Sequence, residues 1–190
     1  MSTDAPQPAA TGAGPYVARR YAVALARPRL TPAALMQQIK CDLPHFAPGL
    51  LADFEKTQGH PDGLAVDDEF QIRILGPWNG SVRVTEVGET YFELITLNGH
   101  PEAGRIRFAA HAHPREAGAL EFEICSWARA RDGLVAFAYD TLGVGRHVQE
   151  ATWRTFCERV AVAAGGQALG PVSVETIVHD PAGTRHEHSA

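Results

Sequence analysis

Residues 67–97 read DDEFQIRILGPWNGSVRVTEVGETYFELITL. Phe70, Ile72 and Ile74 alternate with polar residues, and the pair Asn79-Gly80 follows shortly afterwards. Strict alternation is typical of a strand with one buried face. Asn-Gly is a strong signal for a tight turn between antiparallel strands. This stretch therefore predicts consecutive antiparallel strands.

The same period of two continues to about residue 140. Turn-forming residues separate further runs that we predict to be strands: 91–97, 105–111, 120–127 and 134–139. An earlier run, 16–26, has the same alternation, and a short strand is also compatible with 172–178. Together these runs predict an antiparallel meander of six or seven strands.

Helical spacing flanks the meander on both sides. Thr31-Pro32 is a typical helix start, because Thr caps free N–H groups and Pro suits the first helical position. We predict a second short helix over 50–57 and one long helix over 146–164. The long helix has an apolar stripe, Gln149, Trp153, Phe156, Val160 and Ala164, and a polar face, Glu150, Arg154 and Glu158, that is expected to meet water.

Composition describes an ordinary globular chain. It has 190 residues, 45% of them hydrophobic and 21% charged, which predicts one domain. The net charge of −5 argues against nucleic acid as a partner. There is no apolar run of about 18 residues that would predict a membrane span. Three irregularly spaced cysteines give no disulfide framework, so we expect a cytoplasmic protein.

The ends of the chain read as unstructured. Residues 1–15 are rich in small residues, Pro and Gly, and predict a disordered leader. Residues 180–190 predict a loose tail, which includes His186-Glu187-His188. We assign no role to this tail, and we expect the single domain to occupy residues 16–179.

Several motifs carry a resemblance. Thr96-Leu97-Asn98-Gly99-His100-Pro101-Glu102-Ala103-Gly104 is followed by Phe108, by the segment Phe122–Arg129 and by Val148-Gln149 in the long helix. Over residues 66–166 the chain resembles the DUF1990 family. The resemblance implies an α+β helix-grip fold (START/Bet v 1-like), in which a curved antiparallel sheet surrounds a long C-terminal helix. It implies hydrophobic-ligand binding by analogy of shape, and no established activity.

His100 and Glu102 are the most suggestive pair. A His and a carboxylate two residues apart on a turn fixed by Pro101 can act as an acid–base pair or hold a polar ligand group. The structural alternative is a turn in which both residues bond the backbone. We favour the structural alternative, and keep both residues as candidates for ligand binding.

Ser126, Gln149 and Trp153 are the other candidate ligand-binding residues. Ser126 alternates with Phe122 and Ile124, so its hydroxyl is expected on the apolar face. Gln149 is an amide on the apolar stripe of the helix, where it bonds the sheet or faces a hollow. Trp153 follows it one turn later and is expected to face the sheet. By the same alternation, Trp127 lies on the opposite face from Ser126.

Other reactive residues receive structural interpretations. The spacing of His111 and His113 binds zinc in some proteins, but without a third ligand nearby in sequence we favour a solvated hairpin end. Cys41, Cys125 and Cys157 lie in apolar surroundings and are expected to be packing residues. If Arg83 or Arg107 points inward, Glu102 is its candidate partner. We predict neither a metal ion nor a cofactor.

Three functions are compatible with these sequence features. The first is binding of a small apolar or amphipathic molecule between the sheet and the long helix. The second is an enzyme of the cyclase, hydratase or isomerase type that uses the same cavity. The third is a protein-interaction partner with a filled core. A cavity of about 300 Å³ or more favours the first two, and a packed interior favours the third.

Overall fold

The computed structural model describes residues 5–47, 49, 52–74, 79–133, 144–180 and 183–189. The helices are η1 (Ala9–Thr11), α1 (Pro32–Cys41), α2 (Leu43–Phe46) and α4 (Val144–Ala164). The strands are β1 (Ala13–Ala26), β2 (Ala52–Gln58), β3 (Glu69–Ile74), β4 (Gly80–Val87), β5 (Tyr91–Thr96), β6 (Glu102–Ala112), β7 (Ala119–Ala130), β8 (Gln167–Ala168), β9 (Ser173–Asp180) and β10 (Gly183–Ser189).

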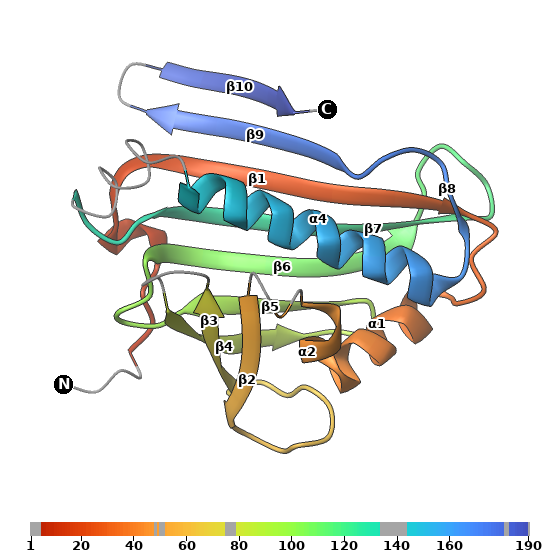
Figure 1. Ribbon diagram of the computed structural model, residues 1–190, viewed down its shortest axis with the longest axis horizontal. Helices are drawn as coiled ribbons and strands as arrows, with labels where there is room; N and C mark the ends of the chain where they lie inside the picture. The colour runs from red at the N-terminus through yellow and green to blue at the C-terminus, as the bar shows by residue number, and fades with distance from the viewer. Residues whose placement is uncertain are drawn as a thin grey trace.

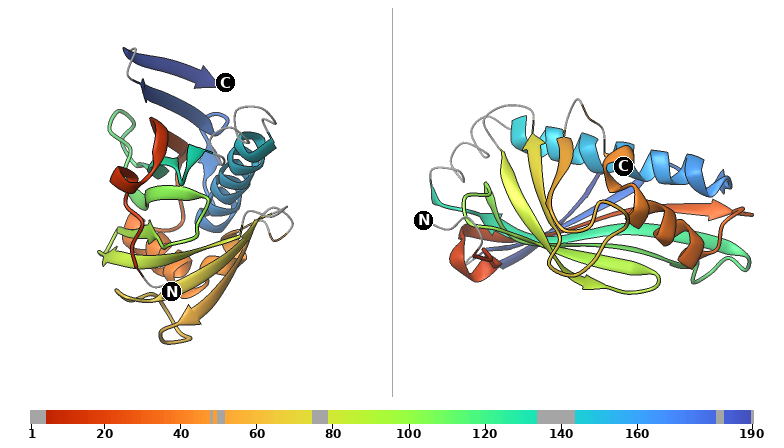
Figure 2. Two further views of the ribbon diagram at one scale, coloured as in Figure 1. Left: turned by 90° about the vertical axis from the view of Figure 1, so that its left-hand side faces the viewer. Right: turned by 90° about the horizontal axis from the view of Figure 1, so that it is seen from below.

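The strands form one antiparallel sheet in the order β10-β9-β1-β7-β6-β5-β4-β3-β2, and β8 adds to β1 (Figure 1). The sheet curves, and α4 lies along its inner face with α1 and α2 beside it (Figure 2). This arrangement confirms the predicted α+β architecture. The predicted strand over 134–139 lies outside the described residues.

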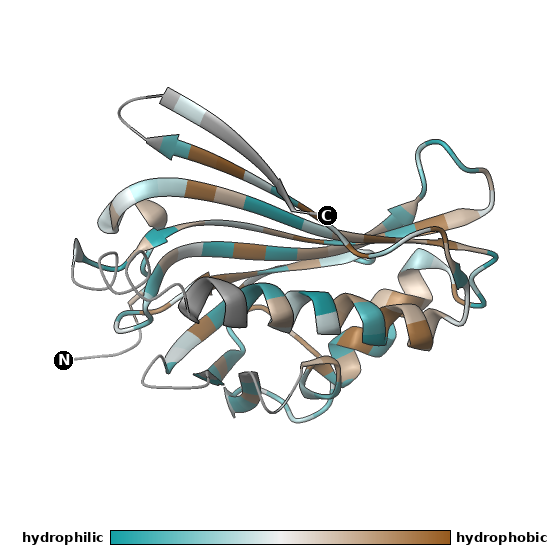
Figure 3. Ribbon diagram, turned by 45° about the horizontal axis from the view of Figure 1, so that its top comes forward, coloured by the Kyte–Doolittle hydropathy of each residue, from teal (hydrophilic) through white to brown (hydrophobic). Residues whose placement is uncertain are grey.

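The core forms where the inward residues of neighbouring strands line up. Tyr21 pairs with Ile124, and Phe108 pairs with both Ile124 and Phe92 across the sheet. The Phe92 and Phe108 rings stack with centroids 4.7 Å apart. From α4, Phe156 packs against Phe108 and is fully buried. Figure 3 shows the resulting alternation of hydrophilic and hydrophobic residues along the strands.

The N-cap prediction for the first helix is confirmed. The Thr31 hydroxyl accepts a hydrogen bond from the Ala34 N–H at 3.2 Å, and Pro32 is the first helical residue. Leu35, Met36 and Ile39 are fully buried on one side of α1. This side contacts β6 and α4.

The predicted helix over 50–57 is wrong. Residues 52–58 form β2, in which Phe54 pairs with Ile72 of β3 and is buried between exposed neighbours. The second helix lies earlier, at Leu43–Phe46, where Asp42 caps it. Pairing with β3 outweighs the helical spacing of Leu50, Leu51 and Phe54 in the sequence.

The ends of the chain are more structured than the sequence predicted. Residues 183–189, expected as a loose tail, form β10 along β9. In the expected leader, η1 forms and Gln7 is buried. A few hydrogen bonds to the rest of the sheet order these segments despite their small and polar composition.

The face of α4 expected to meet water is only partly exposed. Glu158 is exposed, but Arg154 is partly buried, and it donates to the Val172 carbonyl at 2.9 Å and to Glu150 at 2.8 Å. Arg154 therefore ties α4 to the chain that leads into β9. No helix among the described residues is both long enough and apolar enough to cross a membrane.

Candidate functional site

A cavity of about 50 Å³ lies between the first half of α4 and the sheet. Strands β2 to β7 line it with mostly apolar side chains, among them Phe54, Ile72, Val82 and Leu94. Polar and charged residues line it too: Thr96, His100, Glu102, Arg105, Ser126 and Gln149. Such a lining can orient a ligand by a small number of hydrogen bonds without solvating it.

The five candidate residues predicted from the sequence all line this cavity. They are His100, Glu102, Ser126, Gln149 and Trp153. The alternation in β7 and the phase of α4 were therefore assigned correctly, and Trp127 lies on the opposite face, under the Arg105 guanidinium at 4.4 Å. That these residues bind a ligand stays a prediction.

His100 is buried and tied to the backbone, as the structural alternative predicts. Its Nδ1 lies 3.0 Å from both the N and the O of Glu102, so either neutral tautomer finds a backbone partner. Burial lowers the pKa of His100 to about 4. A Cβ on Gly80 would lie 2.2 Å from the His100 ring, so only glycine allows β4 to approach this turn.

The Glu102 side chain belongs to a partly buried chain of hydrogen-bonded polar groups. Gln149 Nε2 donates to Glu102 Oε2 at 2.9 Å, and Arg19 Nη1 donates to Gln149 Oε1 at 2.5 Å. Arg19 Nη1 also lies 3.9 Å from Glu102 Oε1. Burial raises the pKa of Glu102, although Arg19 and Gln149 both act to lower it. The Gln149 amide thus bonds the sheet and faces the cavity at once.

The cationic partner of Glu102 was not among those expected. Arg83 pairs with Glu69 at 2.6 Å, and Arg107 lies over the Tyr91 ring at 3.8 Å. The partner is Arg19 of β1. Arg19 lies two residues before the buried Tyr21, so the alternation of β1 predicts that its side chain faces the same, inward side.

Trp153 lines the cavity and carries an unsatisfied donor. The residue is 8% exposed, and its indole Nε1–H has no hydrogen-bond partner among the described residues. Its ring packs edge-on against Phe108, with centroids 5.6 Å apart. A buried donor without an acceptor costs free energy, which an acceptor atom entering the cavity would recover.

Gln7 stabilises the His100–Glu102 turn and was not predicted from the sequence. Its Nε2 donates to the carbonyls of His100 and Glu102, both at 2.9 Å. Its backbone pairs with Thr96, whose hydroxyl also accepts from the Gly104 N–H. The small residues and prolines around Gln7 predicted a disordered leader, so nothing in the sequence indicated that this side chain is ordered.

The cysteines agree in part with expectation. Cys157 is fully buried and Cys125 partly buried, and burial raises the pKa of both thiols, that of Cys125 to about 11. Cys41 is exposed at the end of α1, so its predicted packing role is wrong. Its apolar neighbours in the sequence face the other side of that helix.

The fold and site define a helix-grip protein of the START/Bet v 1-like class, with an internal cavity under its C-terminal helix. The chain belongs to the DUF1990 family, a domain of unknown function, which it matches over residues 12–159. This match begins well before the residues 66–166 that carried the resemblance. No curated protein is significantly similar to the chain.

Solved structures agree on the fold. Norcoclaurine synthase from Thalictrum flavum superposes with a TM-score of 0.54 and 9% identity, over 78% of this chain and 86% of that one. A Thermobifida fusca protein solved by NMR gives a TM-score of 0.50 and 13% identity, over 79% of this chain and 96% of that one. At these identities the likeness concerns the fold alone.

Proposed function

We propose that this protein binds a small, largely apolar molecule in the cavity between α4 and the sheet. The observation that carries the proposal is the unpartnered, buried indole N–H of Trp153, a residue that lines the same cavity as Glu102. A ligand oxygen that accepts this hydrogen bond would satisfy the indole, and the apolar lining would hold the rest of the molecule.

The volume limits what the ligand can be. About 50 Å³ accommodates roughly four water-sized groups. This is well below the roughly 300 Å³ typical of pockets for drug-sized ligands. The cavity therefore suits only a very small molecule or one end of a larger one, and a larger ligand requires the first half of α4 to move away from the sheet.

The test is a thermal-shift screen of small ketones, amides and esters, compared with hydrocarbons of similar size. A ligand that binds only the folded state at 100 times its Kd stabilises it by about 2.7 kcal/mol. We expect Trp153→Phe to weaken the binding of the carbonyl compounds selectively, because phenylalanine lacks the indole N–H but keeps an aromatic ring. Trp127→Phe, on the opposite face, is the matched control.

Mass spectrometry of small molecules extracted from the native protein complements the screen. A co-purified compound would support the proposal. If the protein converted a hit from the screen chemically, the enzyme function would be favoured instead. No hit and no co-purified compound would contradict it.

A second candidate function is a protein-interaction partner with a filled core. The small volume favours it, together with the rings of Phe108, Trp153 and Phe156 that fill the space beside the cavity. Failure of the ligand screen would favour this candidate.

A further inference from the structure

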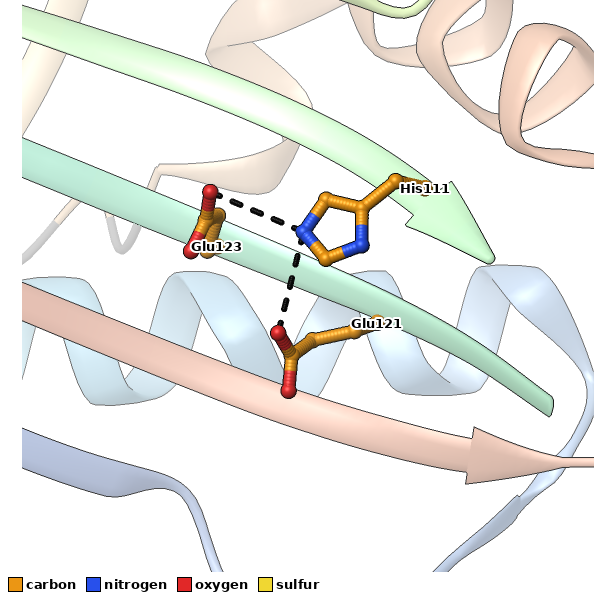
Figure 4. Close-up of side chains that lie close together, drawn as sticks. All are labelled: His111, Glu121 and Glu123. Carbon is orange, nitrogen blue, oxygen red and sulfur yellow. Dashed lines mark ion pairs between the residues drawn. The ribbon is translucent and has the colours of Figure 1, made fainter. Parts of the chain in front are cut away.

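A second cluster of reactive groups lies on the face of the sheet opposite α4. His111 of β6 pairs directly with Glu121 of β7, and Glu123 is the diagonal neighbour, across from Ala109. Both carboxylates point at the same ring nitrogen, His111 Nε2, with one oxygen of each at 3.6 Å (Figure 4). The sequence alone did not predict this cluster, because Glu121 and Glu123 lie on the strand that follows His111.

The His111 ring is oriented so that Nε2 carries the lone pair when the imidazole is neutral. Its Nδ1 lies 3.1 Å from the Ala112 carbonyl oxygen, which can only accept, so Nδ1 carries the hydrogen. A lone pair and two carboxylate oxygens then converge on one point. A cation bound between these three atoms would stabilise this arrangement of the neutral ring. In metal sites, the ring nitrogen of a histidine that does not bind the metal commonly donates to a backbone carbonyl in this way.

Arg20 of β1 also bonds both carboxylates, Glu121 through the same oxygen that faces His111 and Glu123 through its other oxygen. Its guanidinium lies 2.6 Å from Glu121 Oε1 and 2.6 Å from Glu123 Oε2. Glu175 of β9 lies 3.9 Å from the same guanidinium. Three carboxylates thus surround one arginine, so the cluster keeps a negative charge that attracts a cation. Arg20 is a positioning residue that fixes the carboxylates and leaves Glu123 Oε1 facing His111.

His113 does not complete the zinc pair that its spacing suggested. Its Nδ1 accepts the N–H groups of Glu116 at 3.0 Å and Arg115 at 3.3 Å, so Nε2 carries the hydrogen in the neutral ring. That nitrogen faces Glu121 Oε2 at 3.9 Å. His113 therefore stabilises the hairpin and is not a ligand.

We propose that His111 Nε2, Glu121 and Glu123 form a binding site for a divalent transition-metal ion such as Zn²⁺, with water completing the coordination. Zinc lies about 2.0–2.1 Å from nitrogen and oxygen ligands, which places tetrahedral ligand atoms about 3.3 Å apart. The two nitrogen–oxygen separations of 3.6 Å need only a small contraction, and all three ligand atoms lie within 4.8 Å of one another. An imidazole with two carboxylates favours such ions over Mg²⁺, which prefers oxygen ligands alone.

The site is accessible from solvent. The His111 side chain is 41% exposed, whereas those of Glu121 and Glu123 are 14% and 23% exposed. The site is separate from the cavity, because the Phe122 and Ile124 side chains, which alternate with these glutamates along β7, point inward to the core. The proposal therefore stands or fails independently of ligand binding under α4.

The experiment is isothermal titration of the full chain with ZnCl₂ near neutral pH. All variants carry His186→Ala and His188→Ala, so that the histidines of the C-terminal segment cannot contribute to binding. We expect one saturable site, and at least a roughly tenfold loss of affinity in both His111→Ala and Glu123→Gln. His179→Ala, an exposed histidine of β9, is the matched control and should bind as the parent does. MgCl₂ should give no saturable binding.

Circular dichroism of the metal-free variants verifies that each is folded. Co²⁺ provides a second readout, because its visible absorption changes when an imidazole and carboxylates replace water. Equal affinity in His111→Ala and the parent would show an adventitious ion only and overturn the proposal. Absence of saturable binding would overturn it too.

Discussion

Burial acts in opposite directions on two neighbouring residues of the cavity. It disfavours the charged form of each, so it lowers the pKa of His100 and raises the pKa of Glu102. Both side chains are therefore biased toward neutrality. The sequence predicted this pair as a site but not its electrostatics, because burial depends on Gln7, Gly80 and α4, which lie far away along the chain.

His100→Ala should destabilise the protein by about 1–3 kcal/mol at pH 7.5, because the turn loses its backbone partner. The penalty should shrink at lower pH. Between pH 6.5 and about 4 the unfolded chain protonates His100 and the folded protein does not, so the wild type loses stability there and the variant is spared that loss. Urea unfolding at pH 7.5 and 5 measures both values. His60→Ala, at an exposed histidine, is the control. If His100→Ala lowered the free energy of unfolding equally at both pH values, the burial of a neutral His100 imidazole would be contradicted.

Glu102→Gln should show the reverse dependence. A raised folded-state pKa means that the folded protein holds its proton more tightly than the unfolded chain. The wild type therefore loses stability as the pH rises from 4.5 through that pKa, and the variant does not. The Tm of Glu102→Gln relative to wild type should rise from pH 4.5 to 8. Glu158→Gln, exposed on α4, should show no such trend, and a flat difference for Glu102→Gln would refute the prediction.

At the scale of elements, the sequence predicted the helices and strands whose buried residues recur at one regular spacing, helical or alternating. The stripe of α4 and the alternation of β7 placed Trp153 and Ser126 at one cavity. The alternation of β1 also pointed Arg19 inward, although its pairing with Glu102 needed the order of the strands. The segment 52–58 was mistaken for a helix because its single buried ring, Phe54, does not distinguish period two from helical spacing.

Trp153→Ala should cost about 3–5 kcal/mol, since it leaves a void between α4 and the sheet. Trp153→Phe should cost much less, because the indole N–H that it removes has no partner among the described residues. Val162→Ala is the matched control on the same helix, since Val162 is 83% exposed. Chemical denaturation of the three variants gives the comparison. Equal costs for Trp153→Ala and Val162→Ala would contradict the position of this tryptophan.

At the scale of the whole molecule, the sequence predicted the antiparallel sheet around a helix but not its width. The strand order places β1 between β7 and β9, although β1 comes first in the chain. A meander of neighbours cannot reveal such a position, because the pairing of β1 with β7 and β9 joins segments that are far apart in sequence. The edge strands β2 and β10 were missed because their own patterns are weak.

Two truncations test where the folded domain ends. Removal of residues 181–190 deletes β10, which pairs with β9 alone among the described strands, so we expect a cooperative transition and a Tm lower by only a few degrees. Removal of residues 171–190 also deletes β9, with the buried side chains of Val172 and Val174 and the carbonyl that receives Arg154. Burial of the two valines contributes about 3–6 kcal/mol, which corresponds to a Tm lower by about 6–24 °C in a chain of this size. Differential scanning calorimetry distinguishes the two outcomes. A small decrease of the Tm in both truncations would place β9 outside the domain. A large decrease in both would make β10 part of the domain, because the edge strand would then be needed to keep β9 in register against β1.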